Sequence, residues 1–244
     1  MTAAEVCLDH ARVSQRQACL VGLFLATVGA ISGGCADTIS LGYQEQIFPP
    51  HVPGGERTTV KVIVHDFRQS DRVGTKKGFL FGLFAAVDMG PIVTANDVRE
   101  FVEDSLQAEL RRRGFHSSGA PNVIVAVALR KYLNEFQTTV ASGDAQADVV
   151  IDLRVYKGSL EQGPPVYRSR YQGRETLENV GSLGGESAKR ALDAAFANMM
   201  RTVLSDRQLM RALLQASPQP PAAPGAPPAA PDAPAAAPDA SSSS

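Results

Sequence analysis

The chain contains no tryptophan, and its three cysteines all lie within the first 35 of its 244 residues. Because no cysteine follows Cys35, a disulfide framework and a cysteine-based zinc site are both excluded from the rest of the chain. A strong charge of either sign is also missing, since the formal net charge is -1. Such a chain has no general attraction for polyanions, so we expect no nucleic-acid partner.

Histidine is scarce, and its positions argue against a metal centre. The four histidines are not spaced as metal ligands: His10, His51, His65 and His116. The noteworthy pair is His65-Asp66 at the end of a predicted strand, and neighbours on a strand point to opposite faces, so the two cannot act as a base and its orienting group. We therefore expect no metal and no cofactor.

Motifs for nucleophilic or phosphate chemistry are incomplete. The segment Gly184-Gly185-Glu186-Ser187 lacks the last glycine of a nucleophile elbow, and residues 78–82 lack the lysine of a phosphate-binding loop. Turn residues explain both segments. We expect no catalytic residues and no enzyme activity, and an envelope hydrolase is kept only as a remote alternative.

The N-terminus has the pattern of an export signal. Arg12 and Arg16 precede a 14-residue apolar run, residues 18–31, which is too short to cross a bilayer comfortably. Small residues, 32–34, then lead directly to Cys35, as in a bacterial lipobox, although Ser32 stands where leucine is usual. We predict a lipoprotein-type signal peptide at residues 1–34 and a palmitate-containing lipid on Cys35. The alternatives are ordinary cleavage near Gly34 or an uncleaved N-terminal anchor.

Two further expectations concern the leader and its destination. Glu5 and Asp9 are unusual in the cationic part of a signal peptide, so Val13 is a candidate for the true start. The residue after the lipidated cysteine, Ala36, differs from the aspartate that resembles an inner-membrane retention signal in enteric bacteria. We therefore predict a periplasm-facing lipid anchor in the outer membrane, and the inner membrane is the alternative.

Composition divides the mature chain into three parts. Residues 35–59 become rich in proline and glycine and predict a tether with one short edge strand. Residues 60–216 carry the periodic apolar pattern of one domain. Residues 217–244 hold nine prolines among alanine and serine, so they cannot bury a core and are expected to be disordered.

Periodicity within residues 60–216 predicts an α+β domain. Apolar residues alternate in strand-like runs at 60–64, 122–132, 147–157 and 166–173, and they recur at helical spacing in residues 98–110, 185–204 and 206–214. This order predicts a four-stranded, mostly antiparallel sheet with two main helices on one face. Residues 78–93 are apolar but interrupted by glycine, and they predict either a hairpin or buried loop, or a loop that touches a membrane.

Strand alternation also predicts the side chains on the uncovered face of the sheet. If Val125 and Ile151 lie beneath the helices, the opposite face carries a mixture of arginine and tyrosine that suits anionic groups on a lipid or glycan. This candidate binding surface comprises Arg130, Tyr132, Arg154, Tyr156, Arg168 and Arg170. The alternative is a solvated face on which Asp152 pairs with neighbouring arginines.

Residues 91–216 resemble the YajG family of small bacterial lipoproteins. The resemblance rests on these segments: Ile92-Val93-Thr94, Leu110-Arg111-Arg112-Arg113-Gly114-Phe115, Pro121-Asn122-Val123, Ala147-Asp148-Val149-Val150-Ile151, Tyr167-Arg168-Ser169-Arg170-Tyr171 and the closing helix from Asp206 to Leu214. It implies a lipid-anchored outer-membrane protein of poorly defined role, with only the anchor Cys35 carried over. The apolar, glycine-rich segment and the proline-rich tail depart from the family pattern.

These observations favour a membrane-anchored envelope lipoprotein that acts as a non-catalytic binding or scaffolding module. Its expected partners are the membrane, through the lipid, and an envelope protein, lipid or glycan. The alternative is an accessory lipoprotein of a lipid or envelope-polymer transport system. A solvent-open groove lined by apolar residues would favour the alternative.

Overall fold

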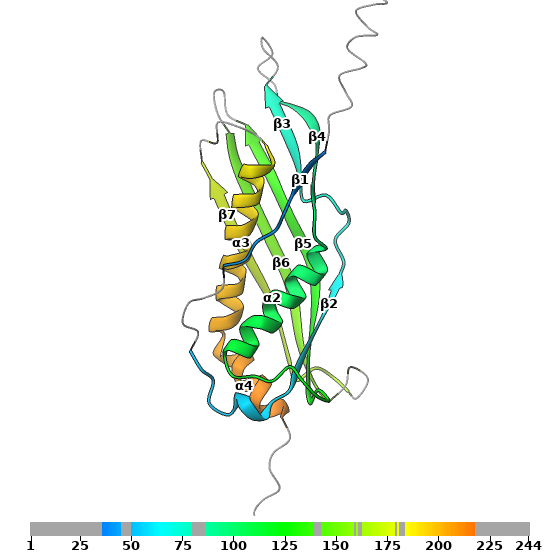
Figure 1. Cartoon of the computed structure of the whole chain (residues 1–244), viewed down its shortest axis with the longest axis vertical. Coiled ribbons are helices and arrows are strands. Elements are labelled where there is room, and N and C mark those ends of the chain that lie inside the picture. Colours follow the sequence, from blue (N-terminus) through cyan, green and yellow to red (C-terminus); the bar gives the residue numbers. More distant parts are fainter. Residues whose placement is uncertain are drawn as a thin grey trace, which may run out of the picture.

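A computed structural model describes residues 36–44, 50–79, 86–138, 143–158, 160, 163–178, 180 and 184–217. These residues form one α+β body with a mixed, seven-stranded sheet. Figure 1 shows that the body is elongated along its strands, with Ala36 near one end and Ser217 at the other. The predicted signal peptide with Cys35, and residues 218–244 of the predicted tail, lie outside the described residues.

Three long antiparallel strands form the centre of the sheet: β5 (Val123–Thr138), β6 (Gly143–Lys157) and β7 (Tyr167–Leu177). The preceding strand, β2 (Val60–Asp66), runs parallel to the first half of β5. Alternation of β-branched residues with polar ones explains these strands, because one set of side chains packs inward while the other meets solvent.

The remaining strands extend the sheet beside the second half of β5. Strand β3 (Gly74–Phe79) pairs antiparallel with β4 (Ala86–Thr94), and short β1 (Asp37–Ile39) runs parallel to β4. Segment 78–93 therefore covers the end of β3 and most of β4, and these two strands form a β-hairpin. A hairpin was one of the structures predicted for this segment. Its connecting residues, 80–85, lie outside the described residues, so contact of that connection with a membrane stays a prediction.

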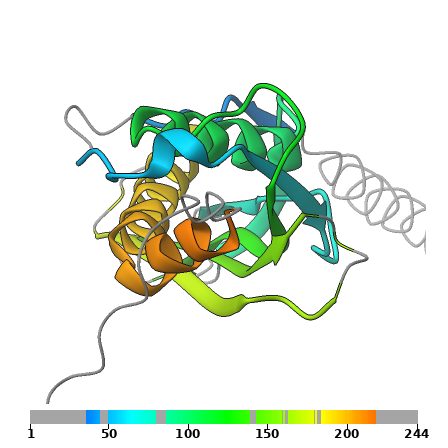
Figure 2. The same cartoon turned by 90° about the horizontal axis from the view of Figure 1, so that it is seen from below.

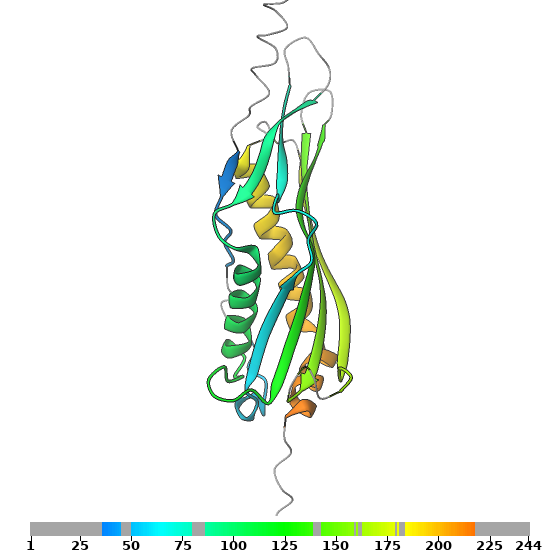
Figure 3. The same ribbon diagram turned by 90° about the vertical axis from the view of Figure 1, so that its right-hand side faces the viewer.

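Three helices belong to the described part of the chain: α2 (Val98–Arg112), α3 (Gly185–Ser205) and α4 (Arg207–Ala216). Helices α2 and α4 begin at aspartate N-caps, Asp97 and Asp206, whose carboxylates accept hydrogen bonds from the first free backbone N–H groups. Figures 2 and 3 show the helices gathered on one side of β5, β6 and β7. This agrees with the predicted helix layer.

The core lies between the helices and the inner face of the sheet. Phe196 of α3 is fully buried and contacts three aromatic rings, with centroids 5.4 Å from Tyr43, 4.8 Å from Phe101 and 6.3 Å from Tyr132. Gly173 on β7 lets α3 approach closely, because a Cβ at that position would lie 2.0 Å from the backbone oxygen of Ala195. At Gly173 there is therefore no room for a side chain between β7 and α3.

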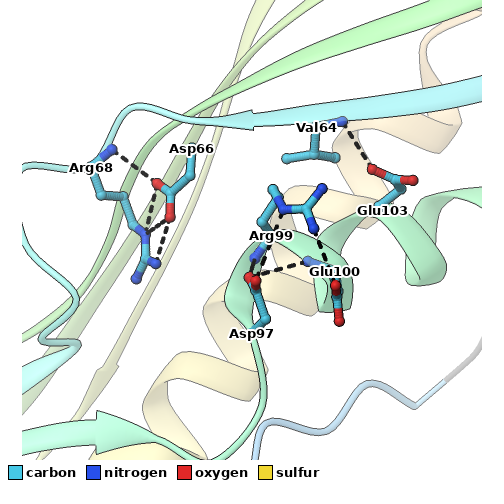
Figure 4. Close-up of polar contacts among 7 residues, drawn as sticks. All are labelled: Val64, Asp66, Arg68, Asp97, Arg99, Glu100 and Glu103. Carbon is cyan, nitrogen blue, oxygen red and sulfur yellow. Dashed lines mark hydrogen bonds and ion pairs between the residues drawn. The ribbon is translucent and has the colours of Figure 1, made fainter.

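Side chains from α2 cover the free edge of β2. Gln107 accepts a hydrogen bond from the N–H of Val62 (3.0 Å) and donates one to the carbonyl of Val60 (3.1 Å). One turn away, Glu103 accepts from the N–H of Val64 at 3.2 Å, as Figure 4 shows. These contacts replace a neighbouring strand, so the edge does not present a free row of donors and acceptors to another chain.

The predicted four-stranded, mostly antiparallel sheet is corrected to a mixed sheet of seven strands. The difference has two causes. Segments 74–79 and 86–94 contain glycine, lysine and proline, which are poor strand formers, yet each is paired along its length. In addition, α2 connects β4 to β5, and β2 joins β5 in the parallel direction, a pairing that alternation within one strand cannot predict.

The segment predicted as a tether is folded into the domain where it is described. Ile39 and Leu41 are buried, and Leu41 exchanges hydrogen bonds with the side chain of Asn96. Tyr43 packs edge-on against Phe196. The sequence did not indicate this role, because the composition of the segment is polar. The few apolar side chains within residues 36–43 are the ones that enter the core.

Candidate functional site

The uncovered face of the sheet carries the candidate site. Inward residues of β5 and β6 such as Val127 and Leu153 are fully buried beneath the helices. Their neighbours in sequence point to the opposite side, where Figure 3 shows no described element covering the sheet. Register places the outward residues in rows across the strands, so that Ala126, Arg154 and Arg168 share one row, and Ala128, Asp152 and Arg170 share the next.

A β-bulge in β5 changes which side chains reach this face. The pairing with β6 shifts between Leu129 and Lys131, which leaves Arg130 as the extra residue. Beyond the bulge the alternation is reversed, so Lys131 faces outward. Tyr132 was predicted on the outer face; the structure places it in the core, 1% exposed, against Phe196. Strict period-two alternation predicts the wrong face because it cannot anticipate the bulge.

The half of this face nearest Val123 is basic. We call its five cationic side chains the basic patch: Lys61, Arg130, Arg154, Arg168 and Arg170. Asp152 is the one acidic side chain in the same rows of the described strands. The chain as a whole carries a formal net charge of -1, so positive charge is concentrated here rather than shared by the whole surface.

Asp152 is held between two arginines of the basic patch. Arg130 donates from Nε to Oδ2 at 2.9 Å, and Arg170 donates from Nε to Oδ1 at 2.6 Å and from Nη2 to Oδ2 at 3.2 Å. The hydrogen bonds from Arg170, followed by those from Arg130, lower the pKa of Asp152 to about 2 against the opposing effect of burial. The carboxylate is therefore ionised at all physiological pH values and neutralises part of the patch.

Arg154 and Arg168 are directly opposite each other on β6 and β7. Neither guanidinium forms an ion pair with any carboxylate of the described residues. Asp152, two residues before Arg154 on the same face, is already occupied by Arg130 and Arg170. Like charges directly opposite on a sheet are destabilising, so the fold retains this pair at a cost.

A shallow apolar groove of about 240 Å³ lies beside this arginine pair. Phe67 and Leu160 border it and are 55% and 38% exposed. The guanidinium carbon of Arg130 lies 4.8 Å from the centre of the Phe67 ring, a cation–π contact. The remaining lining residues are His65, Ala126, Val127, Ala128, Asp152, Arg154 and Tyr156.

Five of the six predicted surface residues therefore share the outward face: Arg130, Arg154, Tyr156, Arg168 and Arg170. Sequence analysis missed Phe67 and Leu160, which follow β2 and β6. The signal available for both was a large apolar residue within a polar loop. That signal is weak, because isolated exposed apolar residues are common on protein surfaces.

A second polar cluster joins β7 to the junction of α3 and α4. The hydroxyls of Tyr167 and Tyr171 lie 2.7 Å apart, and each donates to Oδ2 of Asp206, at 2.6 and 2.7 Å. Burial acts to raise the pKa of Asp206, but the hydrogen bonds from the two tyrosines and from the N–H groups of Leu209 and Gln208 together lower it. Because the other carboxylate oxygen caps α4, the cluster serves to fix that helix on the sheet.

Within the described ranges, no group of three or more His, Cys, Asp or Glu side chains is arranged to hold a metal ion. None of the helices described there has the combined length and apolar composition needed to cross a bilayer. The outward face of the described strands instead brings together two opposed arginines, an aromatic ring and a shallow groove.

The described domain is an α+β fold with a helix layer on one face of its sheet and the other face exposed, and such a fold does not by itself define a function. A family model described as "Uncharacterized lipoprotein" matches residues 46–214. The chain belongs to this lipoprotein family, and the resemblance to YajG-like lipoproteins is confirmed. Membership indicates a membrane-associated protein of the cell envelope. No curated relative matches the sequence.

Several solved structures are similar to this chain at low identity. Protein XCC0632 from Xanthomonas campestris is 11% identical, with 73% of this chain and 97% of that chain covered and a TM-score of 0.48. A presumed lipoprotein from Caulobacter crescentus is 12% identical over 68% of this chain and 96% of its own, with a TM-score of 0.41. A minor lipoprotein from Acinetobacter baumannii is 10% identical over 70% and 100%, with a TM-score of 0.36.

Proposed function

We propose that this protein is a lipid-anchored envelope lipoprotein whose domain is a non-catalytic binding module, and that it takes an anionic ligand on the basic patch. The observation that carries the proposal is the pair Arg154 and Arg168, opposed on neighbouring strands without a carboxylate partner among the described residues. An anion bridging both guanidinium groups would remove their repulsion and gain charge-assisted hydrogen bonds.

The volume of the groove limits how much of a ligand can bind in it. Its volume of about 240 Å³ is below the roughly 300–1,000 Å³ of sites that enclose a drug-sized molecule. It therefore accommodates one part of a larger ligand, such as a short apolar group, while the neighbouring arginines contact an anionic group. This arrangement fits binding or scaffolding better than catalysis, for which the site offers no nucleophile paired with a base.

The anchor is proposed from the sequence together with the family. Cys35 follows the small residues at the end of an export signal, and no other cysteine remains in the mature chain. We place the lipid on this residue, and we place the protein in the outer membrane because Ala36 follows the cysteine. Metabolic labelling with a palmitate analogue tests the lipid: wild type should be labelled, and Cys35→Ala should not. Equal labelling of both would contradict the anchor.

A role as accessory lipoprotein in lipid or envelope-polymer transport is the second candidate. The exposure of Phe67 and Leu160 at the groove favours it, because these side chains would contact an acyl chain whose head group meets Arg154. The ligand would then be an anionic amphiphile, and both its charge and its apolar part would contribute to affinity.

Calorimetric titration separates these functions. The mature chain with Cys35→Ser is titrated with dihexanoyl phosphatidylglycerol below its micelle concentration, with dihexanoyl phosphatidylcholine, and with glycerol phosphate. The transport role predicts tighter binding of the first than of either other compound. Binding of glycerol phosphate at equal strength indicates that the anion alone is recognised.

Arg154→Ala with Arg168→Ala is the test variant, and it should lose the binding while its fold is kept. Arg174→Ala is the matched control, because this arginine lies on the same strand face outside the basic patch. Binding that is absent from the wild type for all three compounds, or that survives in the double variant, would contradict the proposal.

A further inference from the structure

The lipid-bearing position lies next to the folded domain. Cys35 is joined to Ala36, and strand β1 begins at Asp37. Two residues of fully extended chain span at most about 7 Å. If Cys35 carries the anchor, the first strand of the domain must therefore lie within that distance of the membrane surface.

The first strand cannot separate from the body to lengthen this link without losing several contacts. Asp37 accepts hydrogen bonds from Lys76 and from the N–H of Gly185, each at 3.0 Å. Farther along, the N–H of Gly42 donates to Asp193 at 3.1 Å, and Ile39 is 5% exposed. Residues 37–42 are thus fastened to β3, β4 and α3, so the anchor is attached to a fixed point.

The hairpin of β3 and β4 extends past that fixed point. Register places Asp37, Ile92 and Gly74 at one level across β1, β4 and β3. From this level the paired strands continue for five residues, to Phe79 opposite Ala86, which is about 17 Å at about 3.3 Å per residue. The hairpin therefore reaches about 10 Å beyond the farthest position that Cys35 can take. Figure 1 shows it at the same end of the molecule as Ala36.

The described surface of this end is compatible with a layer of phospholipid head groups. Both lysines of β3 are ion-paired, Lys76 with Asp37 and Lys77 with Asp88. Met89 is the extra residue of the bulge between β3 and β4, and its side chain is 48% exposed. Interfacial segments bury apolar groups about 5–10 Å into a membrane, which matches the excess length of the hairpin.

We propose that the domain docks end-on to the phospholipid bilayer that holds its lipid, with the described ends of β3 and β4, Phe79 and Ala86, at the head-group layer beside Cys35. This inference rests on the lipid anchor of the proposed function. It commits the domain to one orientation, because a fixed point and a hairpin that projects past it define which end meets the membrane.

The orientation has a consequence for the basic patch. Ala128 lies six residues along β5 from Asn134, which is level with Gly74, so the groove is about 20 Å below the level of Asp37. The groove is then outside the head-group layer of the anchoring bilayer. A ligand bound there must come from solution or from another protein. Ser217, where the described chain ends, is at the far end (Figure 1).

Fluorescence quenching by head-group nitroxide lipids tests the orientation in the full lipidated protein. The vesicles contain phosphatidylethanolamine, phosphatidylglycerol and the nitroxide lipid. Because Cys35 would be blocked by its lipid, a single fluorophore can be attached at Met89→Cys or at Ser118→Cys. Both positions are exposed, and Ser118 lies at the opposite end of the strands. Quenching should be several-fold stronger at position 89 than at position 118.

A spacer of about ten Gly and Ser residues between Cys35 and Ala36 is the control. It adds an average reach of about 17 Å, so quenching at position 89 should fall toward that at position 118. A protein that fails to float with the vesicles would overturn the anchor and this inference together. A protein that floats but is quenched equally at both positions would overturn the end-on orientation alone and leave the anchor in place.

Discussion

Arg170 on β7 and Asp152 on β6 form a two-point contact across the uncovered face of the sheet, with hydrogen bonds of 2.6 and 3.2 Å. Arg130 reaches the same carboxylate from the bulge of β5. The three strands are therefore connected on their outer face by one carboxylate, which holds Arg130 and Arg170 of the basic patch in place.

The first prediction concerns Asp152→Asn and pH. The folded-state pKa is about 2, below the ordinary value of 3.8, so the stabilisation is present above the unfolded pKa and is lost as the pH falls through about 2. Because the arginines are partly exposed, we expect Asp152→Asn to lower the free energy of unfolding by only about 1–2 kcal/mol at neutral pH. Urea unfolding of Asp152→Asn should show less change between neutral and acid pH than the wild type. Asp104→Asn, on exposed α2 surface, is the control, and an identical pH profile for Asp152→Asn and wild type would refute the prediction.

A second prediction concerns the edge of β2. Gln107→Leu removes both hydrogen bonds to Val60 and Val62 and leaves an apolar side chain that is one atom shorter. Urea unfolding should show a loss of about 1–3 kcal/mol, because two backbone groups lose their partners. Gln107→Glu keeps an acceptor for Val62 and should lose less. A Gln107→Leu variant within about 0.5 kcal/mol of wild type would show that water replaces the side chain without cost.

The third prediction is that β7 tolerates no side chain at Gly173. A Cβ there would lie 2.0 Å from the oxygen of Ala195 and 2.5 Å from the nitrogen of Met199, both in the backbone of α3. Gly173→Ala must displace the helix and should cost about 3 kcal/mol or more. Gly42→Ala is the matched control, since its nearest neighbour would be at 3.5 Å. Equal melting temperatures for the two variants would contradict the close helix–sheet contact.

The fourth prediction follows from the burial of Tyr132. Its hydroxyl is buried without a hydrogen-bond partner in the described structure, and burial raises the pKa of that hydroxyl. Tyr132→Phe should therefore leave stability unchanged or raise it by up to about 1 kcal/mol, whereas Tyr132→Ala should cost about 3–5 kcal/mol through the cavity it leaves. Thermal unfolding checks both. A strongly destabilised Tyr132→Phe would indicate a hydrogen bond to an ordered water molecule.

Two helices and the outward residues of two strands could be predicted from the sequence. Helices α2 and α3 were predicted to within two residues at each end, because a regular apolar stripe is a local signal. The outward placement of Arg154, Arg168 and Arg170 followed from alternation on β6 and β7, which contain no bulge. These features depend only on residues near each other in the sequence.

The features that sequence reasoning missed depend on distant partners. The bulge at Arg130 reverses the face of Tyr132, and only the register with β6 reveals it. A short edge strand was predicted within residues 35–59 and is present as β1, but its parallel pairing with β4 and the hydrogen bond from Leu41 to Asn96 depend on residues far away in the sequence. Phe67 belongs to the site because its ring lies beside Arg130, and no sequence motif indicates that contact.

The central claim is that Arg154 and Arg168 are kept opposed in order to bind an anion, and Arg168→Glu tests it most directly. The substitution places opposite charges across β6 and β7 and should raise the free energy of unfolding by about 0.2–1 kcal/mol or more. The single deciding measurement is calorimetric titration of folded Arg168→Glu with dihexanoyl phosphatidylglycerol. The account predicts that this more stable variant no longer binds. Affinity equal to that of the wild type would contradict it.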